Sequence, residues 1–477
     1  MLPEKFKERM IKMLGDEAEK LFFEIENGSA VRSFRVNEIK CPCGELPNGR
    51  IDGKRADFPH ECFYTEEQHP GSLACHHSGQ IYMQDPSAMA TIHAVTVQKG
   101  AKVLDSCSAP GGKTTQLAAL AGDQGIVVAN EYDTKRCRIL QSNVERLGCR
   151  NTVILNHDTK VLAQVYPGYF DVVLCDAPCS GEGMFRKNEL AISDWSEEKV
   201  LGCAEMQREI LSNVQKCVAP GGYLIYSTCT FSLDENEYNV DWFLREHPDF
   251  LLCRVNADLE EATSDGISFD GAIADMRLCR RFYPHISKGE GQFIALLKKN
   301  GSAEGVNAAV AIDFKKQKTK KGSDLQKSKP LRDEIDALAE AKKFVEENLT
   351  EIPNKKLMYA AGKVYLAPEA PLPSFSVFAA GVCVGELERG RFTPHHQLFS
   401  AYGDVFKRKI LLSADDLRAD AYLCGLEISA DGIICENGAK DSGFAAVIID
   451  GASVGGGKVS GGVCKNHYPK GLRGQNK

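Results

Sequence analysis

The sequence predicts an α/β fold built on a parallel, doubly wound sheet, and two observations support that prediction. Between residues 102 and 227, short apolar stretches typical of buried strands alternate with segments of helical length. Three segments follow the ends of such strands: Asp105–Lys113, Asp176–Cys179 and Ser227–Thr230. Because the carboxyl ends of parallel strands share one edge of the sheet, we expect these three segments to meet there.

The elements can be assigned in chain order. Strands are expected at Lys102–Asp105, Ile126–Glu131, Asn151–Leu155, Phe170–Cys175, Tyr223–Ser227 and Gly291–Lys298. Helices are expected at Thr114–Ala121, Thr134–Leu147, Ser196–Val218 and Asn236–Arg245. Pro220-Gly221-Gly222 is expected to stop the third of these helices, and Ser232–Glu235 has the pattern of a capping box that opens the fourth.

The length of 477 residues suits two to four domains, and the pattern divides the chain into five parts. Seven lysines between Lys315 and Lys329 mark a linker, which could also contact phosphates. Leu331–Asn348 has the pattern of an amphipathic helix. The expected parts are an N-terminal domain at 1–78, the sheet domain at 79–300, a lysine-rich linker at 301–332, a small α/β domain at 333–405 and a β-rich C-terminal region at 406–477.

The composition bears on the cellular compartment and on the class of partner. The N-terminus carries charge where a signal peptide would be apolar, and no apolar run is long enough to span a bilayer. Eighteen cysteines without an export signal indicate a reducing cytoplasm, where we expect a monomer. The net charge of −7 does not exclude a nucleic-acid partner, because an acidic chain can still present a basic face.

Gly111 and Gly112 stand at a strand-to-helix junction, where a backbone without Cβ atoms can approach a ligand closely. Glu131 follows about 20 residues later, the offset at which an acid accepts hydrogen bonds from ribose hydroxyls. The alternative is an ordinary tight turn and a solvated glutamate. A phosphate-binding P-loop is disfavoured because Cys107 stands where that motif needs a glycine.

Cys179 and Cys229 are the candidate reactive thiols. Both occupy predicted loops at the edge where ligands bind, and Cys229 precedes a predicted helix N-terminus that would favour its thiolate. The alternative is structural, since most of the eighteen cysteines are expected to be small buried side chains. Cys41, Cys43, Cys62, Cys75, His76 and His77 lack the ligand spacing of a zinc site, so no metal is expected.

These segments resemble the RNA cytosine-C5 methyltransferases of the Nol/Nop/Sun (Fmu) family, which use S-adenosylmethionine. The resemblance rests on Cys107–Lys113, Asp176–Cys179 and Ser227–Thr230. It is supported by Gln84–Ser87, Arg281–His285, Gly289–Gly291 and, in an N-terminal RNA-binding domain, Arg32–Asn37.

The resemblance implies a role for each site residue. Cys229 corresponds to the nucleophile that adds to carbon 6 of cytosine, and Cys179 to the cysteine that assists release. Asp176 corresponds to the acid that contacts the ring at N3. The order of the two thiols rests on the resemblance, because the residues alone leave it open. The implied cofactor contacts are Cys107, Ser108, Ala109, Pro110, Gly111, Gly112, Lys113, Glu131 at the ribose, Asp158 near the adenine, and Asp176.

The C-terminal segments Ala445–Gly451 and Val463–Arg473 resemble the PUA-like end of bacterial RsmF-type members. Such an end implies small-subunit ribosomal RNA, or the small subunit itself, as partner. Transfer RNA is the alternative substrate, and a non-catalytic RNA-binding assembly factor is the alternative function. The tail residues expected to contact phosphates or stack on bases are Lys465, His467, Tyr468, Lys470 and Arg473.

Overall fold

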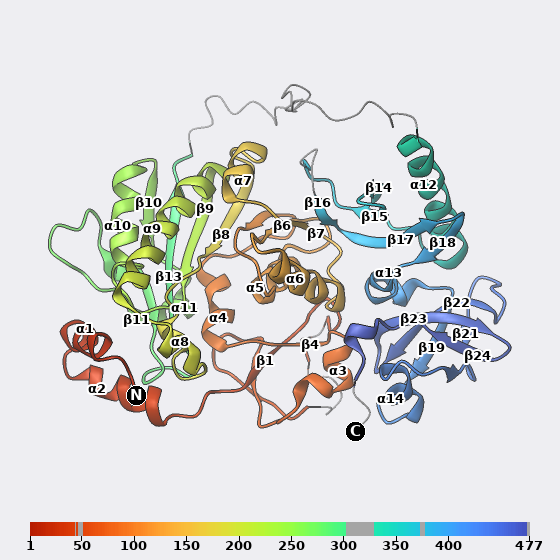
Figure 1. The fold of residues 1–477 in the computed structure, drawn as a ribbon, viewed down its shortest axis with the longest axis horizontal. Helices are drawn as coiled ribbons and strands as arrows, with labels where there is room; N and C mark the ends of the chain where they lie inside the picture. Colours follow the sequence, from red (N-terminus) through yellow and green to blue (C-terminus); the bar gives the residue numbers. More distant parts are fainter. Residues whose placement is uncertain (43, 46–50, 302–328, 373–376, 475–477) are drawn as a thin grey trace.

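The structure is a computed structural model, which describes all residues except 43, 46–50, 302–328, 373–376 and 475–477. In the described residues its centre is a ten-stranded sheet in the order β11-β12-β13-β9-β8-β5-β6-β7-β16, with β10 paired to β13 (Figure 1). The middle strands run parallel to one another, as predicted. They are β5 (Lys102–Asp105), β6 (Ile126–Asn130), β7 (Thr152–Leu155), β8 (Phe170–Asp176) and β9 (Val218–Thr228).

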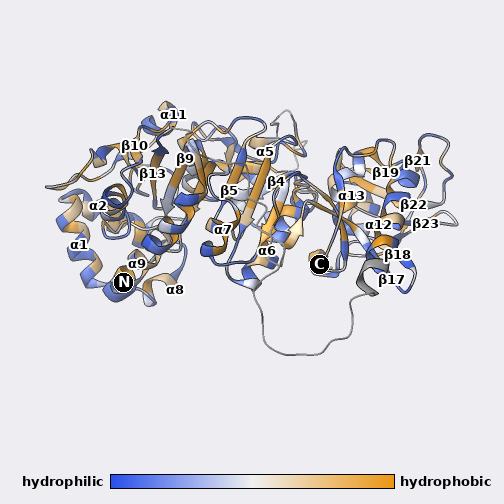
Figure 2. Cartoon of the chain, turned by 90° about the horizontal axis from the view of Figure 1, so that it is seen from above, coloured by the Kyte–Doolittle hydropathy of each residue, from blue (hydrophilic) through white to orange (hydrophobic). Residues whose placement is uncertain are grey.

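Alternate residues of these strands enter two separate cores, one on each face of the sheet. Val103 and Val127 pack with one set of helices, whereas Leu104 and Val128 pack with the other. Figure 2 shows apolar residues concentrated along these strands. The first face is covered by α5 (Gly112–Ala121) and α6 (Thr134–Arg146), and the second by α7 (Thr159–Val165), α9 (Glu197–Val214) and α10 (Glu237–Glu246).

One predicted helix end and one predicted helix cap are wrong. Helix α9 ends at Val214, and Val218 already begins β9, so Pro220-Gly221-Gly222 lies within a strand instead of stopping a helix. The predicted capping box is also absent. Helix α10 begins at Glu237, and the side chain at its N-cap position, Asn236, makes no cap hydrogen bond. Glu235 is instead buried against the loop of Cys179.

Antiparallel strands extend the sheet beyond β9. The predicted closing strand is β13 (Gln292–Lys299), which pairs with β9 from Phe293 opposite Thr228 to Lys298 opposite Tyr223. Two short helices, α8 (Glu189–Ser193) and α11 (Ala257–Glu261), lie in the connections. The other strands of this edge are β10 (Phe250–Cys253), β11 (Ser264–Asp265) and β12 (Arg280–Phe282).

The N-terminal region consists of two helices followed by a small antiparallel sheet in the order β2-β3-β1-β4. This sheet extends to Met83, past the boundary expected at residue 78. In Figure 1 the first two helices of the chain lie at the opposite end of the molecule from the C-terminal sheet. The elements are α1 (Glu4–Leu14), α2 (Glu17–Asn27), β1 (Ser33–Val36), β2 (Lys54–Arg55), β3 (Cys62–Tyr64), α3 (Ala74–His77), β4 (Ile81–Met83) and α4 (Pro86–Ala90).

The C-terminal region is joined to the central sheet, because β16 (Val377–Ala380) pairs antiparallel with β7. The small α/β segment predicted at 333–405 therefore contributes a strand to the sheet of the preceding domain. Helix α12 (Lys329–Asn348) begins two residues before Leu331, and the lysines before Lys329 lie outside the described residues. No helix in the described parts of the chain is long and apolar enough to cross a membrane.

Two further sheets complete this region, in the orders β14-β15-β17-β18 and β20-β24-β23-β22-β19-β21. The first is made of β14 (Lys356–Ala360), β15 (Lys363–Ala367), β17 (Val382–Glu388) and β18 (Arg391–Pro394), followed by α13 (His396–Tyr402). The second contains β19 (Arg408–Leu412), α14 (Leu417–Leu423), β20 (Ile428–Ser429), β21 (Ile434–Cys435), β22 (Gly443–Ile449), β23 (Ala452–Ser460) and β24 (Val463–Asn466).

Candidate active site

The loop between β5 and α5 turns at Gly111, whose φ of 108° lies in the left-handed region that favours glycine. Three side chains from outside the loop hold its carbonyl groups in place. Arg136 Nη2 donates to Ala109 O over 2.8 Å, and Asn143 Nδ2 donates to Pro110 O over 2.8 Å. Arg35 Nη2, from β1, donates to Gly112 O over 3.3 Å. Sequence reasoning missed these three positioning residues.

Two cavities open on either side of Cys107. One, of about 300 Å³, is lined by Glu131 and Asp158 together with the apolar side chains of Met206 and Ile210. The other, of about 220 Å³, is lined by Lys113 and Asp176. An acid-bearing, partly apolar cavity beside a glycine turn suits a nucleoside, so the residues predicted to bind the cofactor do lie together.

Glu131 and Asp158 are each held by a backbone amide. Glu131 is buried and its Oε1 accepts from Asp133 N over 2.9 Å, while Oε2 lies 3.4 Å from Arg136 Nη1. Asp158 is exposed and caps α7, because its Oδ1 accepts from Lys160 N over 2.8 Å. Both carboxylates are thereby oriented at the rim of the larger cavity.

Asp105, at the end of β5, is a site residue that sequence reasoning missed. It is 1% exposed; Oδ2 accepts from Thr114 Oγ1 over 2.6 Å, and Oδ1 has no hydrogen-bond partner among the described residues. Burial raises the pKa of Asp105 to about 7. A buried carboxylate oxygen without a partner, in the lining of a cavity, fits the cationic groups of S-adenosylmethionine. The signal available in the sequence was an acid at the strand end directly before the glycine turn.

The two candidate thiols lie together, with Cys179 Sγ and Cys229 Sγ 3.0 Å apart. Asp176 lies on the strand that leads to Cys179. Its Oδ2 accepts from Lys113 Nζ over 2.8 Å, and its Oδ1 accepts from Ser227 Oγ over 3.0 Å. The parallel sheet therefore brings the three predicted segments to one place.

Lys113 supplies the positive charge of this site. Burial lowers its pKa, but the Asp176 carboxylate and the Cys229 thiol outweigh burial and raise the pKa above its usual value. This cation adds positive charge near Cys229, and α10 begins at Glu237, one residue after its predicted start. The hydrogen bond with Cys229, and then burial, raise the pKa of Cys179, so Cys179 keeps its proton beside Cys229.

Buried polar contacts fix the two thiol loops against each other. Glu235 Oε2 accepts from Ser180 N and from Gln207 Nε2, both over 2.9 Å. Burial raises the pKa of Glu235 to about 6. Gly183 N donates to Cys229 O over 2.9 Å, so the Cys179 loop contacts the backbone of the other reactive cysteine directly.

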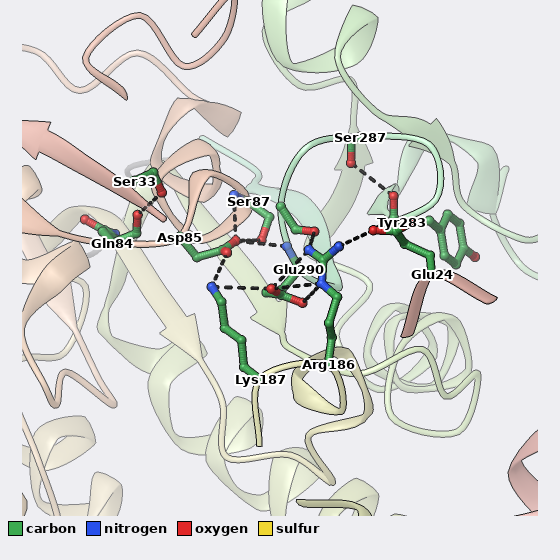
Figure 3. A network of polar contacts seen from close by, with 11 residues as sticks. Glu24, Ser33, Gln84, Asp85, Ser87, Arg186, Lys187, Tyr283, Ser287 and Glu290 are labelled. Atoms are coloured by element: carbon green, nitrogen blue, oxygen red, sulfur yellow. Dashed lines mark hydrogen bonds and ion pairs between the residues drawn. The ribbon is translucent and has the colours of Figure 1, made fainter. Parts of the chain in front are cut away.

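A second network holds the far end of the Cys179 loop (Figure 3). Arg186 Nη2 lies 3.1 Å from Glu290 Oε1, and Arg186 Nη1 lies 2.6 Å from Glu24 Oε1 of α2. Lys187 Nζ lies 2.7 Å from Asp85 Oδ2, the residue that caps α4. These contacts connect the loop to the N-terminal region and to the segment that precedes β13.

The other residues singled out from the sequence are the candidate metal ligands and the C-terminal tail. No cluster able to hold a metal ion occurs among the described residues. Cys62 and Cys75 are buried, and Cys43 lies outside the described chain. Tyr468 was expected to stack on bases but is 1% exposed and bonded to His77 Nδ1, so it is a core residue. Lys465 and Lys470 are exposed.

Three family models match the chain. The model described as 16S rRNA methyltransferase RsmB/F matches residues 92–298, and the N-terminal domain of 16S rRNA methyltransferase RsmF matches residues 2–86. The methyltransferase RsmF PUA domain matches residues 409–474.

Curated relatives and solved structures agree with these matches. The ribosomal RNA small subunit methyltransferase F of Vibrio vulnificus is 31% identical over 84% of this chain and 81% of its own length. That of Serratia proteamaculans is 38% identical over 57% of each chain. The crystal structure of a methyltransferase homologue from Pyrococcus horikoshii is 27% identical with a TM-score of 0.54, covering 62% of this chain and 95% of its own.

The matches extend over the N-terminal domain, the cofactor loop with both cysteine segments, and the C-terminal sheet. The predicted resemblance is therefore confirmed: the chain belongs to the ribosomal RNA small subunit methyltransferase F family of S-adenosylmethionine-dependent methyltransferases.

Proposed function

We propose that this enzyme methylates carbon 5 of a cytosine in small-subunit ribosomal RNA through a covalent cysteine adduct. The observation that carries the proposal is the pair of thiols 3.0 Å apart beside the Lys113–Asp176 ion pair, next to the cofactor cavities. Carbon 5 of cytosine is a weak nucleophile, and a thiolate that adds to carbon 6 converts the ring into a reactive enamine.

Each residue has a task in this reaction. Lys113 and the proton on Cys179 stabilise the Cys229 thiolate, which forms a bond to carbon 6. Asp176 contacts N3, where electron density collects as the thiolate adds. S-adenosylmethionine supplies the electrophilic methyl group, which it would present from the cavities lined by Lys113, Glu131 and Asp158.

The last step restores the aromatic ring. Once Cys229 is bonded to carbon 6, it no longer accepts a hydrogen bond as an anion, and Cys179 releases its proton to solvent water and becomes a thiolate. Cys179 then takes the proton from carbon 5. The pair of electrons of that C–H bond forms the carbon 5–carbon 6 double bond, and Cys229 leaves with the electrons of the C–S bond. Loss of Cys179 should therefore trap the adduct.

The two cysteines predict opposite failures. Cys229→Ala should form neither adduct nor 5-methylcytosine, whereas Cys179→Ala should accumulate enzyme joined to RNA. Cys203→Ala is the matched control, because Cys203 lies in α9 outside the thiol pair. The assay is a denaturing gel with labelled 16S RNA, free and in small subunits, from a strain without the gene. If Cys229→Ala formed an adduct and Cys179→Ala formed none, Cys179 would be the nucleophile and Cys229 would assist release.

The same assay separates the other possible functions. Methylation of transfer RNA but not of 16S RNA would change the substrate, and cofactor binding without any 5-methylcytosine would indicate an assembly factor. We further propose that the C-terminal region contributes affinity for RNA, because Lys465 and Lys470 are exposed on its last strand and tail. We also propose that the protein is a monomer and acts in the cytoplasm. Light scattering of the purified protein tests whether it is a monomer.

A further inference from the structure

A third cavity, of about 570 Å³, is lined in part by Cys179 and by no residue of the cofactor loop. Neither Asp176 nor Cys229 lines it. The target cytosine needs contact with both of these residues, so this cavity is not the place of the reacting ring. Its lining consists of Cys179, Ser180, Gly181, Met184, Asn188, Leu190, Ala191, Ser193, Asp194 and Lys199.

The position of the cavity limits what can occupy it. A ring bonded to Cys229 lies within contact of Cys179, because the two sulfur atoms are 3.0 Å apart. Cys179 is also part of the cavity wall. A part of the substrate close to the reacting ring can therefore reach this cavity. In an RNA strand that part is a neighbouring nucleotide.

The lining combines apolar side chains, which can contact a base, with hydrogen-bond donors for its polar edges or for a phosphate. Leu190 is 75% exposed in the short helix α8, and Met184 provides a second apolar group. An apolar side chain with so little packing of its own can cover the face of a base. Lys199, which pairs with Asp194 over 2.5 Å, and the amide of Asn188 provide hydrogen-bond donors for phosphate or base edges.

The wall of the cavity is fixed before any RNA binds. The Cys179 loop is bonded to Cys229 O through Gly183 N, and Arg186 holds the end of the loop against Glu290, as Figure 3 shows. Asn188 then caps α8, accepting from Leu190 N over 3.1 Å. Because the wall is already ordered, binding a ligand there costs less conformational entropy. This preorganisation is typical of a binding site.

We propose that this cavity binds the nucleotide adjacent to the target cytosine, with Leu190 against its base. The proposal rests on the proposed function and adds a residue that determines which RNA sequence is methylated. Leu190→Ala should therefore affect substrate affinity and the preference for the neighbouring base, and leave cofactor affinity unchanged.

The test compares Leu190→Ala with Leu201→Ala in the full chain. Leu201 is 55% exposed on α9 and does not line the cavity, so it controls for the loss of an exposed leucine. The substrate is 16S RNA from a strain without the gene, with the nucleotide on either side of the mapped cytosine varied. We expect KM to rise about tenfold for Leu190→Ala, as for the loss of one to two buried methyl groups from the contact with the base, with kcat nearly unchanged. We also expect the preference between neighbouring bases to weaken.

A second measurement does not depend on the rate. 4-Thiouridine placed next to the target cytosine should crosslink to the 184–199 segment in the wild-type protein. Leu190→Ala kinetics equal to those of Leu201→Ala, or crosslinks only to other segments, would overturn the inference while methylation by the wild type still supports the proposed function. A wild-type protein that methylates no 16S cytosine would overturn both.

Discussion

Replacement of Asp105 by asparagine should make the cofactor-free protein more stable and its cofactor binding weaker. Asp105 is buried, with one oxygen unpartnered among the described residues, and its pKa is raised from 3.8 to about 7. Its charged form is thus penalised in the folded state. Asparagine has nearly the same shape and can still accept the hydrogen bond from Thr114, but carries no charge.

The size of the stability difference follows from the linkage between proton binding and folding. A carboxyl group whose folded pKa is raised binds more protons in the folded than in the unfolded chain, so stability falls as pH rises from about 4 through 7. A pKa raised by about 3, at about 1.4 kcal/mol for each pKa unit, gives a penalty of about 4 kcal/mol that is fully present at pH 8. The asparagine variant should lack this loss and be more stable than the wild type by up to that amount at pH 8.

Urea unfolding at pH 4.5 and pH 8 tests the prediction, with and without S-adenosylmethionine. The stabilities should nearly coincide at pH 4.5 and diverge at pH 8. Added cofactor should stabilise the wild type more than the variant, because a cationic ligand gains from the charged Asp105. Thr114→Val is a control that removes the partner and keeps the charge. An Asp105→Asn variant less stable than the wild type at pH 8 without cofactor would refute the reasoning.

Three further predictions concern cofactor affinity, stability and RNA binding. Glu131→Ala should weaken S-adenosylmethionine binding by about 1–3 kcal/mol in calorimetry, and unchanged affinity would contradict its assignment to the ribose. Arg281→Ala should cost about 3–5 kcal/mol in urea unfolding, because it strands buried Glu237, to which Arg281 Nε donates over 2.7 Å. A loss below about 1 kcal/mol would show that the pair is solvated. The double variant Lys465→Gln/Lys470→Gln should reduce the slope of the salt dependence of RNA binding, because about one to two fewer counterions are released. An identical slope would show that other residues bind the RNA phosphates.

Sequence patterns predicted the parallel strands because those strands are buried on both faces and bounded by clear turn residues. Lys102–Asp105 and Phe170–Asp176 needed little or no correction. The same local reasoning failed at Val218, where tertiary pairing with Phe170 draws residues next to a helix into a strand. It also failed at Ser232 and Glu235, because a capping box and a buried carboxylate with partners in another loop have the same sequence pattern.

The candidate site was predicted where residues adjacent in sequence carry the chemistry. Long-range contacts were not predictable in this way. Arg35 and Thr115 are bonded across 80 positions, and no local pattern marks Arg35 as a support of the cofactor loop. Likewise, the pairing of Val377 with Leu155, which adds a C-terminal strand to the central sheet, depends on a partner far away in the chain. Tyr468 was misjudged for the same reason, since its burial depends on His77 from the N-terminal region.

The two thiols are held together by contacts between their loops as well as by the paired strand ends from which the loops emerge. Each loop bonds to the other: Phe231 N donates to Glu182 Oε2 over 3.1 Å, and Ser180 N donates to Glu235 Oε2 over 2.9 Å. Since these bonds run in both directions, neither loop can shift without breaking a hydrogen bond between a buried carboxylate and a backbone amide. The proposed reaction, in which Cys229 bonds to carbon 6 and Cys179 takes the proton from carbon 5, needs the two sulfur atoms held together in this way. The buried acids Glu182 and Glu235 therefore serve the reaction by position, without contact with the substrate.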